Sequence, residues 1–171
     1  MSSQPQFTVI GLIHSPFKTP AGTPIQAPLA DETQGAVEVF PAYVDGLRDV
    51  DGFERIWLLY WLDRAPAPQL RVVPFRDEVQ RGLFATRAPC RPNPIGLSCV
   101  RLIRIKGNLL TIMGVDVLDG TPLLDIKPYV PEFDAFPQSR AGWLQHGGNG
   151  RTVANDRFRP DGSRGARGGV A

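Results

Sequence analysis

The run ERIWLLYWL, residues 54–62, is the most apolar stretch of the chain and is rich in aromatic side chains. Asp51 and Gly52 precede it, and Pro66 and Pro68 follow it closely. A core helix segment is the alternative interpretation, but nine residues between a glycine-containing turn and prolines fit a buried strand better. We therefore predict a central β-strand here.

Further short strands are expected on both sides of this one. Residues 106–108 (KGN) suit a hairpin turn because glycine and asparagine tolerate positive φ, and residues 42–50 suit one or two helical turns. No long amphipathic helices separate the strands, which is typical of a β-barrel or sandwich rather than a parallel α/β sheet. The strands are predicted at residues 7–13, 36–40, 69–73, 82–86, 95–105, 109–118 and 123–126.

Length and composition predict one domain. The chain has 171 residues, 42% of them hydrophobic, which supports a single ordinary core, and we assign it to residues 7–146. Residues 147–171 carry five arginines and few apolar side chains, so we expect a flexible Gly/Arg-rich tail. No apolar run reaches membrane-spanning length and the first residues do not look like a signal peptide, so we expect a cytoplasmic protein without a membrane partner.

Cysteine, histidine and arginine content narrows the chemistry. The two cysteines are too far apart for a CxxC pair, and with only two histidines we expect reduced thiols and no metal. Residues 71–104 contain seven arginines but only Asp77 and Glu78 as acids, an excess that suits a phosphate-bearing partner. A solvated surface that merely favours arginine is the alternative.

The segment FATRAPCRPNPIG, residues 84–96, has the composition of a binding loop. Its three prolines fix an irregular backbone around Arg87, Arg91 and Asn93, so it is not a sheet interior. A rigid backbone lowers the entropy lost on binding, and arginine presents a planar fork to carboxylates or phosphates. A proline-rich connector with incidental arginines is the alternative, but we predict an anionic ligand.

Two other stretches are weaker candidates. The segment VLDGTPLLDIKPY, residues 117–129, combines a tight Asp-Gly turn with polar residues, although DGTP by itself is also a good structural turn. The loop at residues 22–28 holds Gln26, which could contact a base or an amino acid. The sequence lacks GxGxxG, GxxxxGK[ST], HExxH and GxSxG, so Rossmann, P-loop, zincin and α/β-hydrolase enzymes lack support.

At these residues the chain resembles the TsaA/TrmO family of tRNA methyltransferases. The resemblance implies a small β-barrel, not a Rossmann sheet, and a cytoplasmic homodimer. It also implies binding of S-adenosylmethionine and methylation of the exocyclic amine of threonylcarbamoyladenosine beside the anticodon of tRNA. The matching stretches are IGLIHSPFK (10–18), GAVEVF (35–40), GFERIWLLYW (52–61), GLFATRAPCRPNPIGLS (82–98) and LDGTPLLDIKPYVP (118–131).

Carried over motif by motif, the resemblance implies a cofactor site drawn from several segments. Arg91 and Lys127 are our hypothesis for the carboxylate of the threonylcarbamoyl group, and Asn93 is assigned to the RNA. Methyl transfer to an amine releases a proton, and Asp119, Asp125 and Tyr129 are the candidate acceptors. The implied cofactor residues are Ile25, Gln26, Ala27, Asp63, Arg64, Arg87, Leu97, Asp119, Gly120, Thr121 and Pro122.

Two competing interpretations stay open on the sequence. A non-catalytic β-barrel that binds RNA would bind tRNA without the cofactor. A methyltransferase for a different substrate would bind the cofactor without acting on threonylcarbamoylated tRNA.

Overall fold

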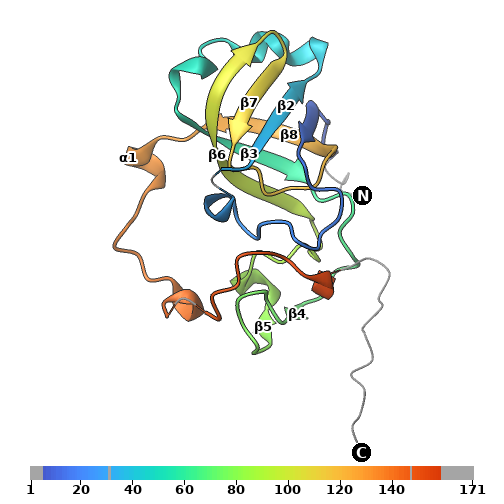
Figure 1. The fold of residues 1–171 in the computed structure, drawn as a ribbon, viewed down its shortest axis with the longest axis vertical. Coiled ribbons are helices and arrows are strands. Elements are labelled where there is room, and N and C mark those ends of the chain that lie inside the picture. Colours follow the sequence, from blue (N-terminus) through green and yellow to red (C-terminus); the bar gives the residue numbers. More distant parts are fainter. Residues whose placement is uncertain (1–5, 31, 147, 159–171) are drawn as a thin grey trace, which may run out of the picture.

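The computed structural model describes residues 6–30, 32–146 and 148–158. Within these residues, six strands close into a barrel in the order β1-β2-β7-β6-β3-β8, and β4 and β5 form a separate two-stranded sheet. Figure 1 shows the barrel above this smaller sheet. The strands are β1 (Gly11–His14), β2 (Gln34–Val39), β3 (Arg55–Trp61), β4 (Arg71–Val72), β5 (Arg81–Gly82), β6 (Ile95–Lys106), β7 (Leu109–Met113) and β8 (Thr121–Pro128).

The predicted central strand is confirmed as β3, which pairs antiparallel with β6 on one side and with β8 on the other. Its buried residues alternate with more exposed ones because successive side chains of a strand point to opposite faces. The inward set therefore fills the barrel with branched and aromatic side chains. The fully enclosed members include Ile13, Val37, Ile56, Leu58, Val100, Leu110, Ile112 and Leu123.

The hairpin and the other strands are found largely where they were expected. Gly107 connects β6 to β7 with a φ of +60°, a conformation that glycine adopts at little cost. The prediction of a strand at residues 82–86 is wrong, because β5 ends at Gly82 and a 3₁₀ turn follows at Leu83–Ala85. That turn buries Leu83 and exposes its neighbour, a pattern that alternation alone cannot distinguish from a strand.

Helical structure is short throughout the described residues. The predicted turns at residues 42–50 correspond to 3₁₀ helices at Pro41–Leu47 and Val50–Gly52. None of the helices in this part of the chain has the length and apolar character needed to cross a bilayer. The others are 3₁₀ turns at Ala27–Leu29, Gly142–Leu144 and Asp156–Phe158, and a single α-helical turn, α1 (Pro131–Asp134).

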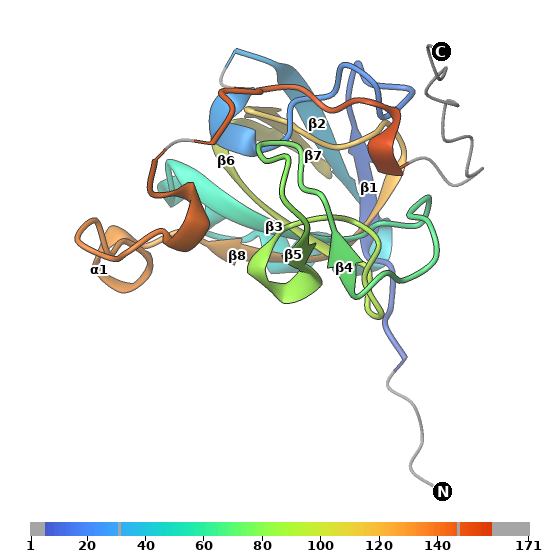
Figure 2. The same cartoon turned by 90° about the horizontal axis from the view of Figure 1, so that it is seen from below.

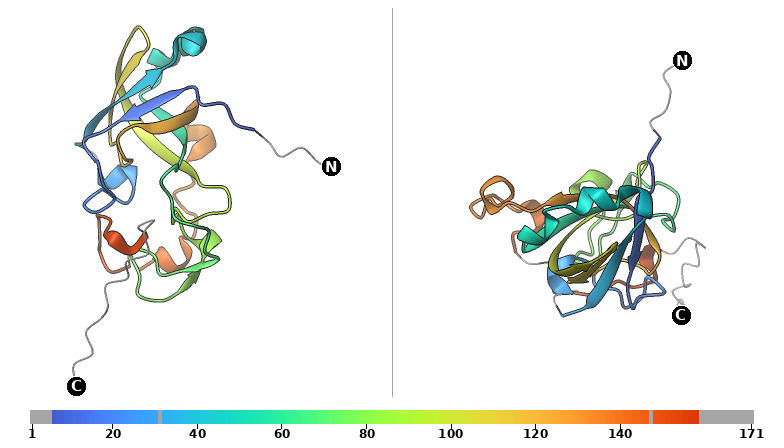
Figure 3. Two further views of the ribbon diagram at one scale, coloured as in Figure 1. Left: turned by 90° about the vertical axis from the view of Figure 1, so that its right-hand side faces the viewer. Right: turned by 90° about the horizontal axis from the view of Figure 1, so that it is seen from above.

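Residues 148–158 differ from the flexible tail expected from composition. They pair with the loop after β1 through a bridge between Pro24 and Val153, and Phe158 is buried in a small cluster with Val72, Leu83 and Cys90. Figures 2 and 3 show this segment on the same side of the barrel as β4 and β5. The low apolar content concealed one buried side chain, Phe158, and the backbone hydrogen bonds of residues 152–154 to the loop after β1. The rest of the predicted tail, residues 147 and 159–171, lies outside the described residues.

Candidate functional site

A cavity of about 360 Å³ opens at the end of the barrel that faces β4, β5 and residues 148–158. This volume falls within the range of about 300 to 1,000 Å³ that small-molecule sites occupy. Its walls come from separate parts of the chain, all of them loops or strand ends. The lining side chains come from within residues 20–26 after β1, 60–66 at the end of β3, 86–91, 95–97 at the start of β6, 116–121 at the start of β8, and 154–158.

Most of the predicted cofactor residues meet in this cavity. Ala27 is buried next to the lining loop, while Asp119, Gly120 and Pro122 belong to the adjoining turn and do not line the wall. The residues that do line it are Ile25, Gln26, Asp63, Arg64, Arg87, Leu97 and Thr121. These predicted residues lie up to 96 positions apart in the sequence, yet they converge on one site.

Gly96 makes room for an aromatic ring at the cavity wall. It lies opposite Tyr60 in the β3–β6 register, and a Cβ at this position would come within 2.0 Å of the Tyr60 ring. No side chain fits there while the ring keeps its place. The glycine of the NPIG motif thus allows the tyrosine to pack flat across the start of β6.

The cavity contains a half-buried acid, Asp116, that the sequence did not single out. Asp116 Oδ1 accepts a hydrogen bond of 2.6 Å from the Ser98 hydroxyl, whose oxygen lies 2.9 Å from the Tyr60 hydroxyl. Because the serine proton is directed to the carboxylate, Tyr60 donates to Ser98 and the three groups form one chain. Burial raises the pKa of Asp116 from 3.8 to about 6, although its bond to Ser98 opposes this shift.

The same chain affects Tyr60. Burial, reinforced by the negative charge of Asp116, raises the pKa of Tyr60 far above its usual value, so the phenol stays protonated. An acid that interrupts the apolar run LLTIMGVDVL, residues 109–118, was the available signal in the sequence. It was missed because that run was interpreted as one strand, whereas β7 ends at Met113 and Asp116 follows it in a loop.

Arg87 connects two walls of the cavity. Its guanidinium donates a hydrogen bond to the Gln26 side-chain oxygen, which joins the FATR segment to the loop after β1. Across the described part of the chain no carboxylate lies within ion-pair distance of Arg87. The arginine therefore brings an unneutralised charge and several remaining N–H donors to the cavity.

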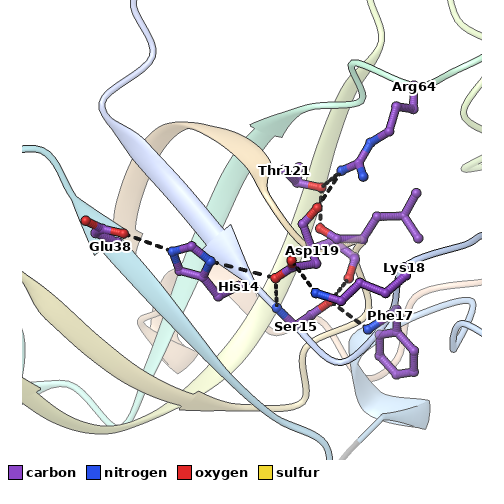
Figure 4. A network of polar contacts seen from close by, with 10 residues as sticks. His14, Ser15, Phe17, Lys18, Glu38, Arg64, Asp119 and Thr121 are labelled. Atoms are coloured by element: carbon purple, nitrogen blue, oxygen red, sulfur yellow. Dashed lines mark hydrogen bonds and ion pairs between the residues drawn. The ribbon is translucent and has the colours of Figure 1, made fainter.

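Asp119 lies in a polar network beside the cavity (Figure 4). Its carboxylate accepts from the Ser15 backbone N–H at 3.0 Å and from the Lys18 ammonium group, and His14 lies between it and Glu38. The hydrogen bond from Lys18 is the main reason that the pKa of Asp119 is lowered. A carboxylate held in this way is a weak base, and its contacts indicate that it fixes the turn.

Arg64 ties that turn to the loop after β3. Its guanidinium donates to the Asp119 backbone oxygen at 3.0 Å and to the Thr121 hydroxyl at 3.1 Å (Figure 4). Gly120, between them, has a φ of +73°, which an L side chain adopts only with strain. The DGTP sequence is therefore a constrained turn whose outer residues hold the wall in place.

The other predicted catalytic residues lie elsewhere. Asp125 and Lys127 form an ion pair of 2.7 Å, and Asp125 lines a second cavity bounded by the 3₁₀ helix Pro41–Leu47. Tyr129 packs edge-on against Trp57 at 5.8 Å between ring centroids. Along β8, Asp125 is four residues beyond Thr121, or about 13 Å at 3.3 Å per residue. The structure thus does not bring these three side chains to the first cavity.

The two predicted RNA residues of the FATR segment differ in position. Arg91 lines the first cavity and donates to the backbone oxygens of Thr86 and Ala88 at 2.9 and 3.4 Å. Asn93 is absent from the lining, and its backbone oxygen accepts from the Ile95 N–H at 2.8 Å. Among the described residues, no group of three His, Cys, Asp or Glu side chains is arranged to hold a metal ion.

Sequence comparison agrees with this geometry. The family model of the tRNA-methyltransferase O N-terminal domain matches residues 12–135. The chain belongs to this family. The resemblance inferred from the motifs is thereby confirmed, and the match covers every wall of the cavity except residues 154–158.

Individual members of the tRNA-methyltransferase O family are similar over most of the chain. A probable S-adenosyl-L-methionine-binding protein of Pyrococcus abyssi is 57% identical over 136 residues, which is 80% of this chain and 74% of that protein. The tRNA (adenine(37)-N6)-methyltransferase of Escherichia coli is 33% identical over 150 residues, covering 82% of this chain and 64% of the enzyme.

A solved structure supports the fold. The crystal structure of TrmO from Pseudomonas aeruginosa superposes with a TM-score of 0.71 at 36% identity, covering 85% of this chain and 63% of that chain. The prediction of a small, mainly β barrel is therefore confirmed. The chain spans somewhat less than two thirds of the length of the Pseudomonas and Escherichia proteins.

Proposed function

We propose that this chain binds S-adenosylmethionine in the 360 Å³ cavity and methylates tRNA, with the exocyclic amine of threonylcarbamoyladenosine beside the anticodon as the acceptor. The observation that carries the proposal is the convergence of the family's motif residues on one cavity. The similarity to the Escherichia tRNA (adenine(37)-N6)-methyltransferase supports the reaction and the RNA substrate.

The side chains of the cavity fit the parts of S-adenosylmethionine. Ile25 and Leu97 offer apolar surface for an adenine ring, and Asp63 offers a carboxylate for hydroxyl or amino groups. Arg87 presents an unpaired guanidinium fork that suits the carboxylate of the methionine portion. When bound, the cofactor supplies a methyl group made electrophilic by the sulfonium. The protein's contribution is then to bind, to orient and to exclude water.

Asp116 is the best-placed proton acceptor. It lies in the cavity wall, its carboxylate is aligned by Ser98, and Tyr60 stays protonated behind it. A carboxylate with a pKa near 6 is ionised at neutral pH yet is a stronger base than an ordinary aspartate. Asp116 replaces Asp119, Asp125 and Tyr129 in this role, because those side chains are either occupied in the turn or outside the cavity.

Arg91 is our candidate for the carboxylate of the threonylcarbamoyl group. It lines the cavity, and two backbone oxygens orient its guanidinium while leaving other donors available. Lys127, the other candidate, is paired with Asp125 at the far end of β8. Asn93 remains a candidate for RNA contact from the neighbouring loop.

Nucleoside analysis after incubation with labelled S-adenosylmethionine tests the proposal. We expect label in the modified adenosine of tRNA that carries the threonylcarbamoyl group and little label in tRNA that lacks it. The Arg91→Ala variant should lose this preference while keeping its affinity for the cofactor. Cofactor binding without a methylated nucleoside would favour a different substrate, and tRNA binding without cofactor binding would favour a non-catalytic barrel.

A further inference from the structure

We propose that the ring of Phe84, together with the guanidinium of Arg91, is a stacking platform for an RNA base that neighbours the nucleotide held in the cavity. The identity of the ligand rests on the proposed function, but the platform is argued from its own geometry. Among the large apolar side chains that the described residues expose, Phe84 is the most exposed, at 76%. Packing within the chain does not explain its position.

Phe84 is exposed on a turn that is firmly held. Leu83, immediately before it, is only 1% exposed and anchors the 3₁₀ turn Leu83–Ala85 in the small core. Thr86 closes the turn with two hydrogen bonds to the Leu83 oxygen, and the Trp143 indole donates to the Ala85 oxygen at 2.7 Å. The ring is therefore presented on a fixed backbone, which lowers the entropy lost when a flat ligand stacks on it.

The charges around the turn favour a nucleic acid over an apolar partner. The Arg91 guanidinium lies over the Phe84 ring, 5.7 Å from its centroid, and Arg81 lies over the Trp143 ring at 5.6 Å. Arg81 also pairs with Asp77, whereas no acid in the described chain pairs with Arg91. Surfaces that bind single-stranded RNA commonly combine aromatic rings with arginines.

Arg91 connects this platform to the cavity. The same side chain lines the cavity and covers one face of the Phe84 ring, so the platform lies at the cavity's edge. Bases of an anticodon loop are already partly unstacked, and one base can enter a pocket while its neighbour stacks outside. A second copy of this chain is the competing occupant, and the oligomeric state of a Phe84 variant distinguishes it from RNA.

Substitutions of Phe84 that separate stacking from apolar contact test the platform. The assay measures KM and kcat for threonylcarbamoylated tRNA, the affinity for S-adenosylmethionine, and anisotropy of a labelled anticodon stem–loop RNA. For both Phe84→Ala and Phe84→Leu, we expect KM and the RNA dissociation constant to rise roughly 10-fold to 100-fold, because stacking requires a ring. Phe84→Trp should stay within about 3-fold of the original protein. Cofactor affinity and kcat should not change.

Phe136→Ala is the matched control, since this ring is 71% exposed and lies outside the cavity wall. It should leave all measurements unchanged. A Phe84→Leu variant with normal RNA affinity would overturn the platform. A binding defect in Phe84→Ala that came from a changed oligomeric state would also overturn it. RNA binding that depends on Phe84 in a protein that does not methylate would uphold the platform and contradict the proposed reaction.

Discussion

The barrel has a cavity at each end, and the two are similar in size but not in chemistry. The first measures about 360 Å³ and the second about 400 Å³, so volume does not identify the functional one. Each is lined by two aspartates, Asp63 and Asp116 in the first and Asp45 and Asp125 in the second. Asp125 in the second cavity is neutralised by Lys127 at 2.7 Å, whereas Asp116 in the first is aligned by a serine hydroxyl and has no lysine or arginine within ion-pair distance in the described chain.

This difference separates an acid paired with a lysine from an acid that has only hydrogen-bond donors beside it. A surface ion pair such as that of Asp125 with Lys127 contributes little to stability. An acid enclosed among neutral hydroxyls keeps a raised pKa, which costs stability but strengthens it as a base. The first cavity also receives the unpaired charge of Arg87, while the second is lined mainly by apolar side chains and aspartates.

Replacing Asp116 or Asp125 with asparagine should give the largest difference in methyl-transfer rate between the two cavities. Asp116→Asn keeps the size of the side chain but removes its basicity, so we expect the methyl-transfer rate to fall by about 100-fold or more. Asp125→Asn, the matched control, should change the rate by less than about 3-fold. Single-turnover assays with saturating cofactor measure both. If Asp116→Asn instead abolished cofactor binding, Asp116 would be a ligand of S-adenosylmethionine rather than a base.

The wall formed by residues 154–158 belongs to the first cavity alone, and Phe158→Ala tests its importance. Phe158 is 8% exposed and contacts Phe75 edge-on at 5.0 Å between centroids. Removing this ring should lower the free energy of unfolding by about 3 kcal/mol and weaken cofactor binding as the wall loosens. Chemical denaturation and calorimetric titration measure the two effects. Phe133→Ala, at a site 68% exposed, is the control and should do neither.

Local signals in the sequence predicted the barrel, and the resemblance of its motifs to the tRNA-methyltransferase O family implied most of the first cavity. The apolar run between a glycine-containing turn and prolines identified β3, the KGN turn identified the hairpin, and the two proline-rich motifs supplied Arg87, Arg91 and Thr121. Asp116 was not selected because its contact with Ser98, and through Ser98 with Tyr60, depends on the pairing of β3 with β6.

The errors have a related cause. Asp125, Lys127 and Tyr129 share a motif with the DGTP turn, but a strand carries neighbours in the sequence away at about 3.3 Å per residue. Proximity in the sequence therefore suggested a shared site that the first cavity does not contain. The packing of residues 148–158 was missed for the opposite reason, since composition averages over a segment and hides the single buried ring, Phe158, and the backbone bridge at Val153 that fix it.

The pH dependence should also distinguish the two aspartates. The pKa of Asp116 is raised to about 6, so the transfer rate should fall about tenfold per pH unit below this value, and Asp116→Asn should lack this limb. Between pH 3.8 and about 6, Asp116 is ionised in the unfolded chain but still protonated in the folded one. The free energy of unfolding therefore falls as the pH rises through this range. Asp116→Asn should therefore be more stable than the original protein at pH 8, by about 1 kcal/mol or more, and equal near pH 4. Equal stability at pH 8 would contradict the burial of an ionised Asp116.

The smallest effect is expected at the turn beside the first cavity. The Asp119 carboxylate accepts hydrogen bonds from the Ser15 N–H and from Lys18. Because the pKa of Asp119 is lowered in the folded protein, these contacts stabilise the fold at neutral pH, and the stabilisation is lost as the pH falls through that pKa. Because Lys18 is largely exposed, Lys18→Ala should cost under about 1 kcal/mol in the free energy of unfolding. Asp119→Asn should cost more, since it also weakens the bond to the Ser15 N–H and loosens the wall that Arg64 holds. Thermal unfolding at pH 7 and pH 3 measures this difference, which should narrow at pH 3.

A transfer rate that fell as far in Asp119→Asn as in Asp116→Asn, with the fold intact, would return the catalytic role to the turn.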